Sequence, residues 1–300
     1  MKTSNSMFAK SVLSKYLAPA IAAVVVGCVA MSANNVHAAQ ENSATSSPAT
    51  KSQALLVSDV SHNALTVDAQ FKGPAPSLVG ILAHDATGRK VVVWVESGKY
   101  VVAGDVFDAS GQSLTRKAEE RFGIVPKTFS PSILAKEAMS ATGFVIGHAG
   151  PLIVAFEDPN CSYCHKFSQD TQAMVEAGKL RIRVIPVAFV KPDSAGKAQA
   201  IVQAASSAQS WIANEAKFDD LHEEGAIAPA TVRDPKVMSE LQSNNTLLAH
   251  SGQYGTPTLV FCAKGGNRYS PVVSHGASPE VLRQLAKVST LEAGGVCAQQ

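Results

Sequence analysis

The residues best suited to chemistry in this sequence are two cysteines with two residues between them. Cys161 and Cys164 enclose Ser162-Tyr163 at the predicted start of a helix. Two thiols at positions i and i+3 of a first helical turn can close a disulfide with little backbone movement. The helix N-terminus carries a partial positive charge that favours the thiolate of the first cysteine. The motif therefore predicts a redox dithiol in which Cys161 attacks a substrate and Cys164 resolves the mixed disulfide.

Three other interpretations of the motif remain as alternatives. With His165 it reads Cys-x-x-Cys-His, the attachment pattern of a c-type haem, for which Met174 could be the second axial ligand. A zinc site usually has two close pairs of ligands, whereas Cys262 and Cys297 stand far apart in the sequence. A purely structural disulfide within the motif would close too short a loop to add much stability. We therefore expect no metal and no cofactor beyond the dithiol itself.

A second motif, Gly255-Thr256-Pro257, lies directly before a predicted strand at 258–261. Proline is unusual at the start of a central strand, because it cannot donate a hydrogen bond to the sheet. A cis bond between Thr256 and Pro257 would explain it and would bring the backbone near the two thiols; an ordinary trans turn is the alternative. In the cis case Thr256 can donate a hydrogen bond to the Cys161 thiolate, and the loop can bind an extended substrate.

The N-terminal segment has the layout of a secretory signal peptide. The first 38 residues contain three lysines but no Asp, Glu or Arg, and they include an apolar run at 17–31 and small residues up to Ala38. The run of about 15 residues is shorter than a membrane-spanning helix needs, although a retained anchor or a lipoprotein signal at Cys28 is an alternative. Export to the periplasm would place the remaining cysteines in an oxidising compartment.

Composition and charge exclude several classes of protein. The 300-residue chain is 46% hydrophobic and 17% charged, which excludes a disordered chain, a collagen and a coiled coil. The formal net charge of +2 becomes −1 once the three lysines of the first 38 residues are removed. No block of five like charges occurs, so nothing indicates a nucleic-acid or membrane-surface partner.

The pattern of apolar and turn residues divides the chain after residue 38 into four segments. Strand signals at 78–83, 90–96 and 100–107 are separated by turn residues and predict a small antiparallel sheet. A helix beginning near Pro131 predicts a partly helical linker before an α/β domain. The predicted boundaries are 1–38 for the signal peptide, 39–52 for a flexible leader, 53–112 for the N-terminal domain, 113–144 for the linker and 145–300 for the catalytic domain.

The catalytic domain is predicted to mix strands and helices. Apolar runs predict strands at 152–156, 181–187, 258–261 and 271–274. Helices are predicted at 161–177 and 279–289, and an Ala-rich helical stretch occupies about 195–250.

Several motifs resemble one known family. The segment Phe-Glu-Asp-Pro-Asn-Cys-Ser-Tyr-Cys-His-Lys-Phe at 156–167 resembles the active-site segment of the bacterial periplasmic disulfide isomerases of the DsbC/DsbG family. Gly255-Thr256-Pro257 resembles the cis-proline loop of that family, and 104–115 resembles the end of its N-terminal dimerisation domain. Asp158-Pro159 and 190–194 look closer to DsbG. The resemblance covers most of residues 55–290.

The resemblance implies a thioredoxin fold with a helical insertion, preceded by a cystatin-like antiparallel dimerisation domain and a helical linker. It implies a periplasmic homodimer that reduces or isomerises disulfides of unfolded or misoxidised exported proteins, and that in some relatives reduces sulfenylated cysteines. A membrane electron donor resembling DsbD would keep Cys161 and Cys164 reduced, and Tyr163, Thr256 and Pro257 would contact substrate. A disulfide-donating oxidase of the DsbA type and a holdase chaperone with secondary redox activity are the alternatives.

The sequence also departs from the family. Ser162-Tyr163 replaces the Gly-Tyr or Pro-Tyr of the relatives, which leaves the reduction potential open. Cys262 and Cys297 match neither relative, and we expect them to form a structural disulfide that fixes the C-terminus, with a regulatory pair as the alternative.

The charged residues beside the motif are expected to have minor roles. Thioredoxin has a buried carboxylate six positions before its first cysteine, whereas this chain has Ala155 there. We expect Glu157 and Asp158 to face solvent or to cap the turn, with proton transfer by Glu157 as the alternative. We expect His165 at the surface or rim of the site, with a role as a base as the alternative.

Overall fold

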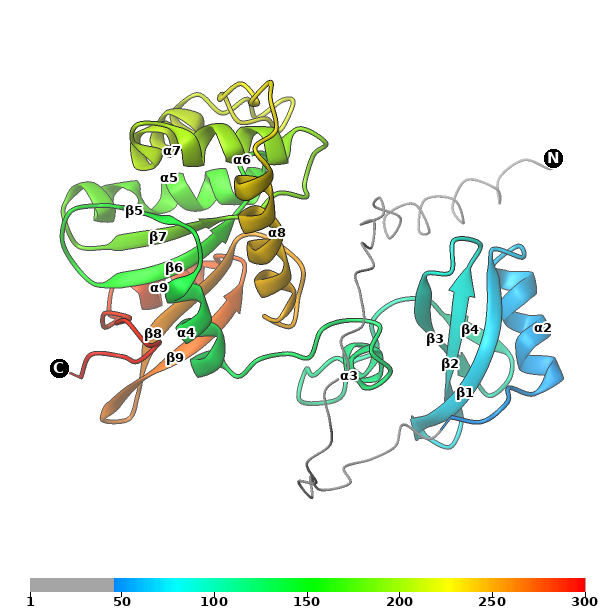
Figure 1. Ribbon diagram of the computed structural model, residues 1–300. Helices are drawn as coiled ribbons and strands as arrows, with labels where there is room; N and C mark the ends of the chain where they lie inside the picture. Colours follow the sequence, from blue (N-terminus) through cyan, green and yellow to red (C-terminus); the bar gives the residue numbers. More distant parts are fainter. Residues whose placement is uncertain (1–45, 300) are drawn as a thin grey trace, which may run out of the picture. The chain divides into compact units, whose positions relative to one another are not determined.

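The computed structural model describes residues 46–299, which contain two β-sheets and the helices packed on them (Figure 1). The predicted signal peptide at 1–38, its alternatives and half of the predicted leader lie outside the described residues. Within residues 46–299, no helix combines the length and the apolar character that a membrane span requires.

The N-terminal sheet is an antiparallel meander with the strand order β1-β2-β3-β4 within residues 46–299. Its strands are β1 (Leu65–Ala75), β2 (Leu78–Asp85), β3 (Lys90–Glu96) and β4 (Tyr100–Val102). Helix α2 (Lys51–Val60) covers one face, where its Val57 packs against Ile81, Val93 and Val95. The predicted antiparallel sheet is therefore present.

Two details of this region differ from the sequence expectation. Helix α2 begins at Lys51, inside the stretch expected to be a flexible leader, because Thr50 and Gln53 form a capping box for its first N–H groups. The strand expected over 100–107 ends at Val102, since Gly104 takes up a positive φ of 137° that a regular strand does not allow.

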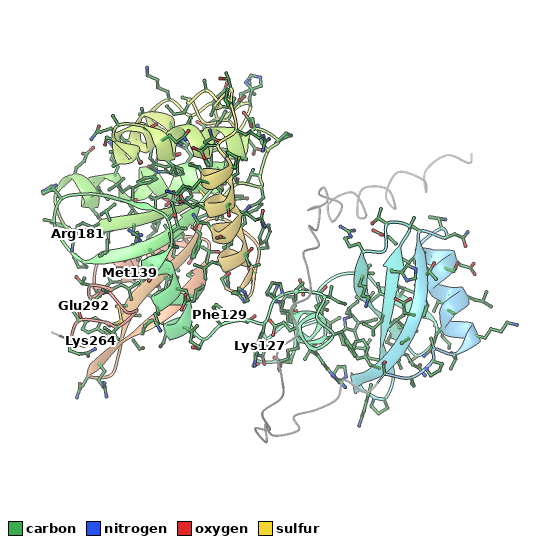
Figure 2. All side chains as sticks on the ribbon, viewed as in Figure 1. Lys127, Phe129, Met139, Arg181, Lys264 and Glu292 are labelled. Atoms are coloured by element: carbon green, nitrogen blue, oxygen red, sulfur yellow. A yellow bond between two sulfur atoms is a disulfide. The ribbon has the colours of Figure 1, made fainter. Side chains whose placement is uncertain are left out.

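Two helices follow before the second sheet, α3 (Leu114–Arg121) and α4 (Pro131–Ser140). Helix α4 buries Leu134, Ala135 and Ala138 completely, in the same apolar cluster as residues of the second sheet. Phe129 and Met139 pack against this cluster from either end of the helix (Figure 2). The helix expected near Pro131 therefore contributes to the core beneath the second sheet.

The C-terminal sheet has the order β5-β7-β6-β8-β9 within the part of the chain that the structure describes. Its strands are β5 (Phe144–Ile146), β6 (Leu152–Glu157), β7 (Arg181–Pro186), β8 (Thr258–Gly265) and β9 (Arg268–His275). Strands β6 and β7 are parallel, and the other neighbours are antiparallel. Every residue of β6 is buried, because helices cover both faces of this central strand.

Alternate residues of β6 enter two separate cores. Ile153 and Ala155 pack with residues of α5 (Ser162–Glu176), α7 (Ser207–Ala216) and α9 (Pro279–Leu285). Val154 and Phe156 enter the other core, which contains residues of α4 and of α8 (Pro235–Ala249). The side chains of a strand alternate between its faces, so the next residue after Phe156 points toward α5 and α7.

The predicted helical stretch at about 195–250 consists of α6 (Ser194–Gln203), α7 and α8, joined by loops. The strand expected at 271–274 extends over the whole of β9, and the helix expected at 279–289 ends at Leu285. The second unit of the fold is an α/β domain with a helical insertion, and an antiparallel sheet precedes it in the chain, as the sequence indicated.

Candidate active site

Cys161 occupies the N-cap position of α5, where the chain changes from extended to helical. Its sulfur accepts a hydrogen bond from the backbone N–H of Cys164 at 3.3 Å. Cys161 is 5% exposed and Cys164 is completely buried, and both are unbonded thiols. The first cysteine is thus at the edge of the protein surface, whereas the second lies inside it.

The second motif lies directly against the first. The Thr256–Pro257 peptide bond is cis, and the Cys161 thiol donates a hydrogen bond to the Thr256 carbonyl oxygen across 3.4 Å. The structure therefore brings together Cys161, Cys164, Thr256 and Pro257, which the sequence analysis selected as site residues.

The two thiols have opposite acidities. The pKa of Cys161 is lowered to about 7, chiefly by a hydrogen bond from the Cys164 side chain, with the Thr256 side chain and the Cys164 backbone N–H adding to it against the opposing effect of burial. Burial raises the pKa of Cys164 well above its usual range, and the neighbouring Cys161 raises it further. Near neutral pH a large fraction of Cys161 is therefore thiolate, whereas Cys164 stays a neutral thiol.

Asp158 is buried and organises the loop beside the dithiol, so the expectation that it faces solvent is wrong. One carboxylate oxygen accepts hydrogen bonds from the backbone N–H groups of Phe189 (2.8 Å) and Val190 (3.0 Å). The other accepts from the backbone N–H of Asn160 and the Ser194 hydroxyl at 2.9 and 2.7 Å. Burial raises the pKa of Asp158 despite these donors. The carboxyl caps the turn that leads into Cys161, as the other expectation for it stated.

A buried lysine, which the sequence analysis missed, supports the same turn. The Lys197 ammonium group is 3.1 Å from the Asn160 side-chain oxygen, 2.8 Å from a Glu224 carboxylate oxygen and 3.3 Å from an Asp193 carboxylate oxygen. It also donates to the Gly225 carbonyl at 2.7 Å. Asn160 immediately precedes Cys161, so Lys197 holds the first cysteine in place through one intermediary. An isolated lysine in an Ala-rich stretch gives no signal of this role.

Glu157 and His165 are also buried, at 1% and 8% exposure, contrary to the expectation of solvent-facing and rim positions. Glu157 follows the odd-numbered residues of β6 that face α5 and α7. This alternation was available in the sequence and would have placed Glu157 inside. His165 lies on the buried side of α5, and its Nδ1 is 3.2 Å from a carboxylate oxygen of Glu215 on α7, a residue that the sequence analysis missed.

Exposed apolar side chains lie on the segments that carry the site residues. Tyr163 is 74% exposed, and Val190 and Tyr254 also project from the segments that meet at Cys161. Tyr254 packs on Phe189 with a distance of 4.4 Å between ring centres. Exposed apolar groups of this kind can contact an unfolded chain without requiring a particular sequence.

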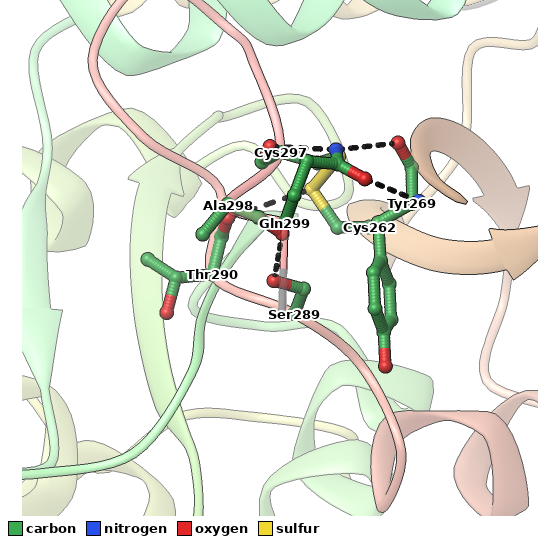
Figure 3. The surroundings of a disulfide bond; sticks show 7 residues. All are labelled: Cys262, Tyr269, Ser289, Thr290, Cys297, Ala298 and Gln299. Atoms are coloured by element: carbon green, nitrogen blue, oxygen red, sulfur yellow. Dashed lines mark hydrogen bonds between the residues drawn. A yellow bond between two sulfur atoms is a disulfide. The ribbon is translucent and has the colours of Figure 1, made fainter. Parts of the chain in front are cut away.

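The other two cysteines form a disulfide away from this site. Cys262 on β8 and Cys297 are joined with a Cα–Cα distance of 5.7 Å, the pairing that the sequence suggested (Figure 3). The segment after α9 returns to β8, where the N–H of Ser289 bonds to the carbonyl of Cys262 at 3.2 Å. The side chain of Gln299 pairs with the backbone of Tyr269 on β9, as Figure 3 shows. The disulfide and the Gln299 contacts therefore fix the C-terminal segment to β8 and β9.

Comparisons with known proteins agree with this description. A family model described as a thioredoxin-like domain matches residues 141–287. The thiol:disulfide interchange protein DsbG of Pseudomonas aeruginosa is 28% identical over 176 residues, which cover 55% of this chain and 62% of that protein. DsbG of Escherichia coli K12 is 24% identical over 212 residues, which cover 69% of this chain and 82% of that protein. The crystal structure of Proteus mirabilis ScsC in a transitional conformation has 22% identity and a TM-score of 0.39, covering 54% of this chain and 81% of that one.

A dithiol at the N-terminus of a helix, placed against a cis-proline loop in a thioredoxin-like domain, defines the class of thioredoxin-fold proteins with a Cys-x-x-Cys site. Within that class, the chain is similar to the thiol:disulfide interchange proteins DsbG and DsbC. The match extends over less than two thirds of the Pseudomonas relative's length.

Proposed function

We propose that this protein is a periplasmic thiol–disulfide oxidoreductase that reduces or isomerises disulfides in exported proteins. The observation that carries the proposal is the difference between the two thiols: Cys161 is 5% exposed and has a pKa of about 7, whereas Cys164 is completely buried and stays neutral. An acidic, slightly exposed thiol is suited to attack the substrate first, and a buried neutral thiol beside it is suited to resolve the mixed disulfide afterwards.

The chemistry follows from this arrangement. The Cys161 thiolate attacks one sulfur of a substrate disulfide, so that a new S–S bond forms and the other substrate sulfur leaves as a thiolate. In reduction, the Cys164 sulfur then attacks the Cys161 sulfur. The substrate sulfur that was bonded to Cys161 leaves as a thiolate, and Cys161 and Cys164 are now joined by a disulfide. In isomerisation, another substrate thiolate releases Cys161 instead, and no net oxidation occurs. With a sulfenic acid the first step expels hydroxide rather than a thiolate.

The remaining parts of the proposal concern partners and location. The first 38 residues support export to the periplasm. The family relationship supports a homodimer paired through the N-terminal sheet, protein substrates with wrong disulfides and a membrane donor resembling DsbD that returns electrons to Cys161 and Cys164. The proposed reaction uses no bound cofactor, because the dithiol itself carries the electron pair.

The acidity of Cys161 weighs against an oxidase. A pKa of about 7 for Cys161 is close to that of thioredoxin, whereas the strongly oxidising DsbA has a first-cysteine pKa of about 3.5. Strong stabilisation of the reduced thiolate is what makes a disulfide a strong oxidant. A holdase activity has one observation in its favour, the exposed apolar side chains of Tyr163, Val190 and Tyr254.

The test is the redox state of the dithiol in intact cells. Thiols are trapped with an alkylating mass tag, and peptide mapping separates the Cys161/Cys164 peptide from those of Cys262 and Cys297. We expect Cys161 and Cys164 to be mostly reduced; a mostly oxidised pair would establish an oxidase instead. In the same cells Cys164→Ser is expected to accumulate mixed disulfides and Cys161→Ser to form none. Suppression of client aggregation by a Cys161→Ala/Cys164→Ala variant would support the holdase.

A further inference from the structure

A buried network of polar side chains connects the helical insertion to the turn that precedes the dithiol. The Asn160 side chain lies at its centre and uses all of its hydrogen-bonding positions. Its nitrogen donates to an Asp193 carboxylate oxygen at 2.9 Å and to the Ser194 hydroxyl at 3.1 Å. Its oxygen accepts from the Lys197 ammonium group and from the Gly225 backbone N–H, both at 3.1 Å. The residue before the attacking cysteine is therefore held both by α6 and by the loop that contains Gly225.

Lys197 is the only buried Lys or Arg within residues 46–299, with 2% of its surface exposed. Besides Asn160, its ammonium group contacts the carboxylates of Glu224 at 2.8 Å and Asp193 at 3.3 Å. Removing such charges from water costs free energy that offsets much of their attraction, so a buried ion pair adds little to stability. A buried cation at this position therefore suggests a role other than stability.

Three carboxylates share this cation. Asp193 and Glu224 contact Lys197 directly, and Asp158 joins the network by accepting a hydrogen bond from a serine hydroxyl of α6 at 2.7 Å. The Asp158 charge raises the pKa of Cys161. A positive charge close to a cysteine has the opposite effect, because it stabilises the thiolate. Lys197 is thus placed to offset the negative charge that the turn itself brings to Cys161.

The turn between the network and Cys161 is fixed by hydrogen bonds and by close packing. The N–H of Asn160 donates to the Asp158 carboxylate at 2.9 Å, and the N–H of Cys161 donates to the Asp158 carbonyl at 3.0 Å. The insertion lies directly on this turn, since a Cβ added to Gly225 would be 2.1 Å from the Pro159 carbonyl oxygen. The buried ammonium group and the Cys161 thiol are therefore held at a constant separation.

We propose that Lys197 is a positioning residue that keeps Cys161 reactive, because it holds Asn160 in place and its positive charge stabilises the Cys161 thiolate. The proposal rests on the proposed function, since it concerns the thiol that attacks the substrate first. Glu224 is the counter-charge of Lys197 and weakens its effect. Loss of Lys197 and loss of Glu224 therefore change the acidity of Cys161 in opposite directions, whereas damage to a purely structural network would change it in the same direction.

The experiment measures the pH at which alkylation of Cys161 by iodoacetamide is half-maximal, by mass spectrometry of the Cys161 peptide. The wild type is compared with Lys197→Met, which removes the charge but keeps a long side chain, and with Glu224→Gln, which removes the counter-charge. Glu223→Gln is the matched control, because its carboxylate belongs to the same loop but forms no ion pair with Lys197. The other titratable groups that face Cys161 or Lys197 are unchanged in all variants: Cys164, Glu157, Asp158, Asp193 and Glu215.

We expect Lys197→Met to raise the midpoint from its value near 7 by about 0.5 pH units, and Glu224→Gln to lower it by about as much. Glu223→Gln should stay within about 0.2 pH units of the wild type. A folded Lys197→Met variant whose midpoint is not above that of the wild type overturns the proposal. A Glu224→Gln midpoint that is no lower than that of Glu223→Gln also overturns it. This second comparison decides the question if Lys197→Met does not fold, because the Glu224 side chain is 46% exposed and its replacement leaves the core intact.

A second measurement is the equilibrium with glutathione, in which two glutathione thiols reduce the Cys161–Cys164 disulfide and become one glutathione disulfide. A less stable thiolate shifts this equilibrium toward the protein disulfide. At pH 8 we expect a shift of about two- to threefold in that direction for Lys197→Met and in the other direction for Glu224→Gln. At pH 5.5 Cys161 is protonated in every variant, so the shifts should disappear.

Shifts of equal size at both pH values overturn the proposal, because only a structural role acts independently of the thiolate. A different result concerns the proposed function alone. A wild type that exchanges with glutathione but reduces no protein disulfide overturns the proposed function and leaves the role of Lys197 standing.

Discussion

The sulfur of Cys161 and the carbonyl oxygen of Thr256 lie 3.4 Å apart, although 95 positions separate the two residues in the chain. The contact joins the start of α5 to the start of β8, two elements whose positions are both fixed by β6. Because β6 is buried on both faces, neither element can move without disturbing a core. The nucleophile is therefore held against a backbone segment that a substrate can also touch.

The acidity of Cys161 is expected to depend on Thr256. Alkylation of wild-type Cys161 should be half-maximal near pH 7, because a hydrogen bond from Cys164 and a second from the Thr256 side chain stabilise the thiolate. Thr256→Val removes one donor and should raise the midpoint by roughly 0.5 pH units. Iodoacetamide alkylation followed by mass spectrometry gives the midpoint. Tyr163→Phe is the control, since it removes an exposed hydroxyl from the same motif; equal midpoints for Thr256→Val and the wild type would contradict the expectation.

Asp158 is expected to contribute mainly to stability. Asp158→Asn places an amide group where the carboxylate now accepts four hydrogen bonds from the loop at Phe189 and Val190, from Asn160 and from Ser194. Loss of buried acceptors should lower the free energy of unfolding by about 2–4 kcal/mol in urea titrations. The same change should lower the pKa of Cys161, because the Asp158 charge raises it. Asp170→Asn, which alters an ion pair with the exposed Lys166, should stay within about 0.5 kcal/mol of the wild type.

The Cys262–Cys297 disulfide should stabilise the fold without affecting exchange at Cys161. It closes a loop across a sequence separation of 35 residues. Such a loop is worth about 4 kcal/mol by restriction of the unfolded chain. The Cys262→Ala/Cys297→Ala variant should therefore unfold at lower urea concentration, while its rate with glutathione disulfide stays within twofold of the wild type. If the folded variant instead reacts more slowly with glutathione disulfide than the wild type, Cys262 and Cys297 have a redox role.

The stability of the reduced protein should depend on pH through Glu215. Its pKa is raised in the folded state from the usual 4.5 to about 8, chiefly by burial, so between these values the folded state binds more protons than the unfolded state. The free energy of unfolding contributed by this group therefore falls as pH rises from about 4.5 to about 8. Glu215→Gln lacks this loss and should be more stable than the wild type at pH 8.5, by a difference on the order of 3 kcal/mol. Unfolding curves at pH 5 and pH 8.5 provide the check, and parallel profiles would refute it.

Much of the fold follows from local signals. Val91 to Val95 form an apolar β-branched run bounded by turn residues, and the strand there is found where it was expected. Helix α5 likewise follows from the turn before Cys161. Strand β1 was not expected, although residues 65–72 alternate apolar and polar side chains along the sequence. This period of two is a local strand signal that the sequence analysis missed.

The site residues that could be predicted are those that are close in the sequence or have a local sequence signal of their own. Cys161 and Cys164 share one helical turn, and Thr256-Pro257 has a backbone signal of its own. Lys197 and Glu215 reach the site from the helical insertion, and nothing local in the sequence shows that their helices lie beneath the dithiol. The role of Lys197 and Glu215 at the site becomes visible only from the way the helical insertion packs against α5 and the turn before it.

This protein contains both a reactive dithiol and a permanent disulfide, so the Cys161 thiolate of one copy could attack the Cys262–Cys297 disulfide of another. Thiol–disulfide exchange requires the incoming thiolate to approach along the S–S axis, so access decides which disulfides react. Cys262 is completely buried and Cys297 is 9% exposed, beneath the returning segment that Ser289 fastens to β8. The burial closes that approach to the Cys161 thiolate of another copy. The C-terminal segment thus shields the disulfide from thiolates, and a reducing dithiol and a permanent disulfide can therefore be present in one chain.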